Sequence, residues 1–241
     1  MPQNAIQFER PLLRMGSIAF LAGIVIVIVS TGFHPSREDP TNHPLVFMDY
    51  ANSDPWIAIH IGQFAGGIVV FAGGFGSLYL LLVRSESSIA SALALLGFAV
   101  VIIAVSTLAI LQAVDGIALK MAVDSWAAAP AEEKVAAFRV AEGIRWTEIC
   151  TNSIFRIPQG TVAVIFGVAI VKSMLLSRWI GGVGVFAGAV MIIAGVEVAY
   201  VGFASSQAGL GAGSVIINWI WVGVLGGLML RKAMSKSNQK I

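Results

Sequence analysis

Long apolar runs alternate with short polar stretches along this chain. Six of the runs reach the length, at least about 17 residues, that a helix needs to cross the apolar core of a bilayer. They are Met15–Gly32, Trp56–Val83, Ile89–Val114, Ile149–Val171, Trp179–Phe203 and Gly213–Leu230. The pattern predicts an all-α integral membrane protein, a bundle of six transmembrane helices.

Composition supports this reading. Of the 241 residues, 57% are hydrophobic and only 12% are charged, whereas a soluble domain carries about 25% charged residues. We therefore treat 1–241 as a single membrane domain. The lone cysteine, Cys150, excludes an internal disulfide.

Basic residues gather on one side of the predicted spans. They are Arg10, Arg14, Arg84, Lys172, Arg178, Arg231, Lys232, Lys236 and Lys240. Because positive loops stay in the cytoplasm, this bias predicts that both termini are cytoplasmic in a multi-pass protein of the plasma membrane. The basic tail, 231–241, is interpreted as a topology anchor that contacts anionic lipid, rather than as a nucleic-acid site.

Two sizeable segments are then expected on the outer face. The loop 33–55 contains four prolines, which favour turns over helix. The segment 115–145 is predicted to be helical, with a start at Pro130 and an apolar stripe of Val135, Phe138 and Ala141 that is typical of a helix lying on the membrane interface.

A polar stripe continues from the second outer segment into the fourth span. Arg145, Glu148, Asn152, Arg156 and Gln159 are spaced by three or four residues, which places them on one helix face. If the helix enters the bilayer near Trp146, Arg156 lies about 15 Å deep. A charge at that depth costs at least ~2.5–3.5 kcal/mol and almost always faces the bundle interior.

A partner for Arg156 is suggested by depth. Glu197 lies about two turns below the outer end of the fifth span, which is joined to the fourth by a short turn. We therefore predict an Arg156–Glu197 pair, with Tyr200 one turn further on the same face as Glu197. The alternative is a purely structural pair that fixes helix packing.

Further polar residues lie at the outer ends of other spans. These are His60, Gln63, Gln112, Asp115 and Asn218. The inner half of the spans carries no charge, which argues against a channel, because a channel needs polar lining along its whole length. The pattern predicts a pocket in spans two to five that opens to the outside and is closed below.

Histidines suggest a second kind of site. His34, Asp39 and His43 share the first outer loop, and His60 follows close by. Two histidines with a carboxylate suit a transition metal such as zinc, copper or non-haem iron. The alternative is that these are ordinary polar residues of a membrane loop.

The stretch KSMLLSRWIGGVGVFAGAVMIIAG, 172–195, resembles a pattern in uncharacterised six-helix bacterial membrane proteins of the domain-of-unknown-function kind. In that pattern a short polar turn with an arginine opens a glycine-spaced fifth helix. This chain has Trp179 after the arginine, where a proline is typical. The resemblance implies the six-helix layout and carries no activity.

Three functions follow as hypotheses. The first is a site for a small or lipid-like ligand, anchored on Arg156 if the ligand is anionic, in a receptor, sensor or carrier. The second is an enzyme at the outer leaflet that uses the histidines, with or without a metal. The third is an accessory subunit of a membrane complex, whose polar cluster only holds helices together.

Overall fold

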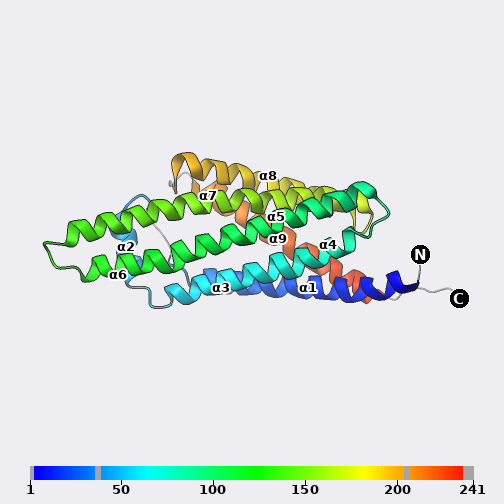
Figure 1. The fold of residues 1–241 in the computed structure, drawn as a ribbon, viewed down its shortest axis with the longest axis horizontal. Helices are drawn as coiled ribbons and strands as arrows, with labels where there is room; N and C mark the ends of the chain where they lie inside the picture. The colour runs from blue at the N-terminus through cyan, green and yellow to red at the C-terminus, as the bar shows by residue number, and fades with distance from the viewer. Residues whose placement is uncertain (1–2, 36–38, 204–206, 236–241) are drawn as a thin grey trace.

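The computed structural model describes residues 3–35, 39–203 and 207–235, and these form helices joined by short turns, with no strand among them. Both chain termini lie at one end of a long bundle (Figure 1). We call this the terminal end and the opposite one the distal end. The last part of the basic tail, including Lys236 and Lys240, lies outside the described residues.

The predicted all-helical fold is confirmed for the described residues. The described residues contain six helices long and apolar enough to cross a membrane. They are α1 (Gln3–Gly32), α3–η1–α4 (Trp56–Ile68, Val69–Phe75, Gly76–Leu82), α5–η2–α6 (Ser88–Ala113, Val114–Leu119, Lys120–Ala128), α7 (Lys134–Ser173), α8 (Arg178–Val201) and α9 (Gln207–Met234). These helices support a multi-pass membrane protein.

Glycines bring α7 and α8 into close contact. Gly160 faces Gly188 and Gly167 faces Gly181, and a Cβ at any of the four would collide with the carbonyl oxygen of the facing glycine. Small residues at such positions let two backbones approach, which is the main source of helix association in lipid. This contact fixes which side of α8 faces α7.

The first distal segment contains a helix, α2 (His43–Ala51), where the prolines had favoured turns. That expectation is wrong because Pro44 lies in the first helical turn, where its missing N–H has no intrahelical acceptor to lose. The Asn42 side chain caps this turn by accepting a hydrogen bond from the Leu45 N–H at 3.3 Å.

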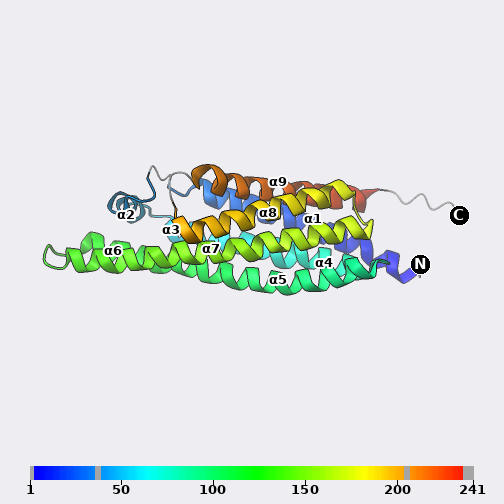
Figure 2. The same cartoon turned by 90° about the horizontal axis from the view of Figure 1, so that it is seen from above.

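The second distal segment is helical, as predicted, but it does not form a separate helix lying across the bundle. Instead, α6 extends the α5–η2 helix, and α7 runs without a break from Lys134 to Ser173. Both run along the long axis and form a hairpin that projects from the bundle beside α2 (Figure 2). The apolar stripe read as membrane-facing contributes Phe138 and Ala141 to a second hydrophobic core.

This distal core holds α2 against the hairpin. Its buried members are Val46, Phe47, Tyr50, Trp56, Leu119, Ala122, Val123 and Ala141. The Lys120 ammonium donates to the carbonyl oxygens of Tyr50 and Ala51 at 3.0 and 2.9 Å. A cation at the last carbonyls of α2 also matches the helix dipole. The distal end is therefore a packed cap on the bundle.

Candidate binding pocket

A cavity of about 350 Å³ lies between the helices below the distal cap. Residues of α1, α3–η1, α5–η2, α7 and α9 line it, and no described residue of α8 does. The walls of this cavity differ from those expected for the pocket. The first and sixth spans contribute, while the fifth span packs behind α7.

Polar groups are concentrated toward the distal end of this cavity, although Phe155 and Val215 line the same half. The distal part is lined by Thr31, His34, Gln63, Gln112, Asp115, Asn152, Arg156, Gln159 and Asn218. The part nearer the terminal end is lined by Ile24, Val27, Val70, Phe71, Phe75, Ala163, Trp221 and Val222. On α7 alone the lining runs from Asn152 to Ala163, about 16 Å at the helical rise. The cavity is therefore long, narrow and amphipathic.

Arg156 is the one cation among the described lining residues, and three neutral groups orient it. Its Nε donates to the Asn152 side-chain oxygen at 2.8 Å. Its Nη1 donates to the Gly211 carbonyl at 3.3 Å and lies 3.5 Å from the Ser214 hydroxyl. No carboxylate of the described residues forms an ion pair with it.

The predicted Arg156–Glu197 pair is wrong. Gly195 is the residue of α8 that packs against the Arg156 side chain and the Ser153 carbonyl. Glu197 lies two residues further, about 200° around the helix, and so points away from the pocket. Its Oε2 is buried and has no hydrogen-bond partner among the described residues. The prediction placed Glu197 at the right level along the bundle but on the wrong side of α8.

Tyr200 also lies outside the cavity. It lies one turn beyond Glu197 on the same side of α8, as predicted, and is 86% exposed. Neither side chain lines the cavity. Neither residue therefore belongs to the candidate binding site.

The polar stripe on α7 divides into two parts. Asn152, Arg156 and Gln159 line the cavity, as predicted. Arg145 and Glu148 do not. They form an ion pair in the distal cap in which the two side chains are 0% and 1% exposed. Arg145 also donates to the Tyr50 hydroxyl at 3.2 Å.

His60 lies behind the cavity wall, where it supports Asp115. Its Nδ1 donates to the Trp56 carbonyl at 2.8 Å, and its Nε2 lies 3.2 Å from the Asp115 carboxylate. The Trp56 indole in turn donates to the Asp115 backbone carbonyl at 3.0 Å. The ring is 1% exposed and is not a lining residue, so it orients Asp115 rather than a ligand.

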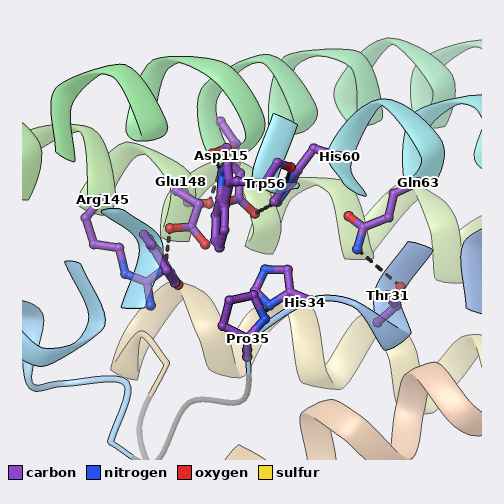
Figure 3. A network of polar contacts seen from close by, with 11 residues as sticks. Thr31, His34, Pro35, Trp56, His60, Gln63, Asp115, Arg145 and Glu148 are labelled. Carbon is purple, nitrogen blue, oxygen red and sulfur yellow. Dashed lines mark hydrogen bonds and ion pairs between the residues drawn. The ribbon is translucent and has the colours of Figure 1, made fainter. Parts of the chain in front are cut away.

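Three sets of polar contacts lie between the cap and the cavity. Figure 3 shows Arg145 with Glu148, Trp56 and His60 with Asp115, and Gln63 with Thr31. The Gln63 amide donates to the Thr31 hydroxyl at 3.2 Å and ties α3 to α1. His34 stands below Trp56 and His60, with its ring centroid 5.5 Å from that of His60.

The four predicted metal ligands are not assembled. His34 and His60 lie near each other, but the His43 ring packs on Phe47 and lies 3.2 Å from Glu142. The described residues contain no group of three or more histidine, cysteine, aspartate or glutamate side chains that could hold a metal ion.

Asp39, the fourth predicted ligand, accepts hydrogen bonds within its own turn. The Thr41 hydroxyl and backbone N–H donate to its carboxylate at 2.7 and 2.9 Å. These hydrogen bonds, the hydroxyl first, hold the pKa of Asp39 below its ordinary value. The carboxylate therefore acts as a turn acceptor.

Several contributors to the pocket were not predicted. Thr31 and Trp219 line it, and Ser214 helps to orient Arg156. A usable signal existed for Ser214, because it precedes Asn218 by four residues and so shares its helix face. No comparable signal singled out Thr31 at the end of an apolar run.

Comparison of the chain with protein-family models, with curated proteins and with solved structures finds no match. The cavity and its lining are therefore the features from which a function is inferred.

Proposed function

We propose that this protein binds an amphipathic ligand, small or lipid-like, in the cavity below the distal cap. The observation that carries the proposal is the change of lining from amides and charges to aromatic and aliphatic side chains over about 16 Å. Such a gradient matches a molecule with a polar head and an apolar tail. The head lies at the distal end and the tail extends toward Phe71, Phe75 and Trp221.

The proposal extends to orientation. The basic residues at the terminal end, among them Arg14, Arg84 and Arg178, favour a cytoplasmic location for that end and for both termini. The distal cap and the polar half of the cavity then face the outside of the plasma membrane. A receptor, a sensor and a carrier all use a site of this kind.

Orientation can be tested by labelling single cysteines in a Cys150→Ala background. Ala131→Cys lies in the exposed turn before α7, and Ser235→Cys lies at the terminal end. A membrane-impermeant maleimide should label the first in intact cells and the second only after permeabilisation. The reverse pattern would place the polar half of the cavity on the cytoplasmic side.

Ligand binding can be tested with a neutral probe, 11-bromoundecan-1-ol, on protein in phosphatidylcholine nanodiscs. Bromine quenches tryptophan on contact, and Trp219 and Trp221 line the cavity. We expect a saturable quench that unbrominated undecan-1-ol reverses. Quenching of exposed Trp146 and Trp179 by probe dissolved in lipid does not saturate and serves as the baseline.

A pair of variants on α1 makes this test specific. Ile24 lines the apolar part of the cavity, whereas Ile28 is 46% exposed and does not line it. Ile24→Phe should weaken probe binding by about tenfold, since overpacking a filled site costs about 1–3 kcal/mol. Ile28→Phe should leave it unchanged. No saturable quench in the wild type would refute the proposed function.

A further inference from the structure

We infer that the head of the ligand is an anion, a carboxylate or a phosphate monoester, held by Arg156, Asn152 and Gln159. This inference rests on the proposed function and assigns the chemistry of the same site. It follows from three observations on the described residues: a cation without a counter-charge, two amides with unused donors, and an acidic residue that faces His60 rather than the cation.

The first observation is the state of the Arg156 guanidinium. Asn152, Gly211 and Ser214 accept from Nε and Nη1, but all three groups are neutral. Nη2 makes no hydrogen bond to any described residue, and it is not sealed off by protein. A cation inside a membrane-spanning helix almost always has a partner. Here the protein orients the charge and leaves its neutralisation to a ligand.

The second observation is the position of two amides on the same face of α7. Asn152 and Gln159 lie four residues before and three residues after Arg156. The Asn152 oxygen accepts from Arg156, so its NH₂ group points elsewhere and has no acceptor among the described residues. The Gln159 side chain forms no hydrogen bond to any described residue either, yet it lines the cavity. Both NH₂ groups are available to donate.

Together these groups make a donor set suited to an anionic oxygen. A guanidinium and two amides give charge-assisted hydrogen bonds, which are about twice as strong as neutral ones. Just beyond Gln159 the lining of α7 becomes apolar at Ala163. An anionic head at Arg156 thus leaves its chain to follow the apolar part of the cavity.

The third observation concerns the negative charge in the lining. Asp115 is the one acidic side chain among the described lining residues. It lies on η2, on a different helix from Arg156, and its carboxylate is 3.2 Å from the His60 Nε2. Asp115 therefore faces His60, and no ion pair joins it to Arg156 among the described residues.

The test compares two probes of equal length on the same nanodisc preparation. One is 11-bromoundecanoic acid, the other 11-bromoundecan-1-ol, and the saturable tryptophan quench gives a Kd for each. The wild type should bind the acid more tightly. Arg156→Gln should raise the Kd of the acid by roughly tenfold or more, which is the loss expected for a hydrogen bond to a charged group. The Kd of the alcohol should change by less than about threefold.

Two further variants guard against a folding artefact. Gln159→Glu keeps the size of the side chain and places a negative charge beside Arg156. It should therefore weaken the binding of the acid, while the alcohol still binds. Arg139→Gln is the matched control, because Arg139 is on the same helix but lies in the exposed part of the distal cap, paired with Glu142. It should alter neither Kd.

Competition by undecanoate and by undecyl phosphate then tells the two anionic heads apart. Tighter competition by undecanoate assigns a carboxylate, and tighter competition by undecyl phosphate assigns a phosphate. Equal Kd values for the acid and the alcohol, unchanged in Arg156→Gln, would overturn the anionic head while the proposed function stands. Absence of a saturable quench with either probe would overturn both.

Discussion

Arg145 and Arg156 lie on the same helix, eleven residues apart, which is three turns and returns to nearly the same face. Their surroundings are opposite. Arg145 is fully buried in the distal cap and forms an ion pair with Glu148, with Tyr50 and Phe203 against its guanidinium. Arg156 lines an open cavity and is held by Asn152, Gly211 and Ser214, which carry no charge.

The difference separates a structural cation from the one that we propose to bind a ligand. A buried ion pair is closed to ligands, and removing one partner leaves the other charge in an apolar environment. An arginine fixed only by neutral acceptors retains its full charge toward the cavity. The burial of an arginine therefore says less about its role than the charge of the groups around it.

The largest effect on stability is expected from Arg145→Met. It removes the cation that accompanies a fully buried Glu148, and breaking such a pair costs about 3–5 kcal/mol. Thermal unfolding in mild detergent should show a much lower Tm than the wild type. The double variant Arg145→Met, Glu148→Gln should recover a large part of this loss. If the double variant melts no higher than the single one, the pair does not stabilise the cap.

Arg156→Gln should behave differently in the same assay. No described carboxylate loses a partner, so the free energy of unfolding should fall by less than about 1 kcal/mol or rise. The change appears instead in ligand affinity, as the roughly tenfold loss for the acid probe. A loss of stability as large as that of Arg145→Met would make Arg156 a structural residue.

Glu197→Gln should stabilise the protein slightly. The Glu197 Oε2 is buried without a partner among the described residues, and an unsatisfied buried charged group costs more than a neutral one. We expect the free energy of unfolding to rise by about 1 kcal/mol, with unchanged binding of both bromoalkyl probes. A drop in acid affinity would return Glu197 to the binding site.

Arg139→Gln should have the smallest effect. Arg139 is 70% exposed and pairs with Glu142 at the surface of the cap, and exposed pairs contribute about 0–1 kcal/mol. We expect its Tm to lie close to that of the wild type, with a slightly larger difference at low ionic strength, where surface pairs are less screened. A drop like that of Arg145→Met would mean that the cap depends on its surface charges.

The spans and the stripe on α7 could be predicted because both depend on spacing along a single helix. Contacts between helices could not. Glu197 was paired with Arg156 on depth alone, although Gly181, Gly188 and Gly195, seven residues apart, mark the side of α8 that meets α7. Glu197 lies nine residues beyond Gly188, on the opposite side. Glycine spacing, combined with depth, would have excluded the pair.

The distal cap was predicted less well than the bundle. Prolines were interpreted as breaking helices, while Asn42 followed by Pro44 is a helix start. The apolar stripe before Arg145 was assigned to lipid because the sequence does not show that α2 covers it. In a membrane protein, apolar residues face either lipid or another helix, and hydrophobicity does not distinguish the two.

The most direct test of this account is the Kd of 11-bromoundecanoic acid for the wild type and for Arg156→Gln, measured side by side in nanodiscs. We expect saturable binding to the wild type and affinity at least about tenfold weaker in the variant, with the alcohol probe bound alike by both. Equal acid affinities in the two proteins would contradict the central claim that Arg156 holds the ligand.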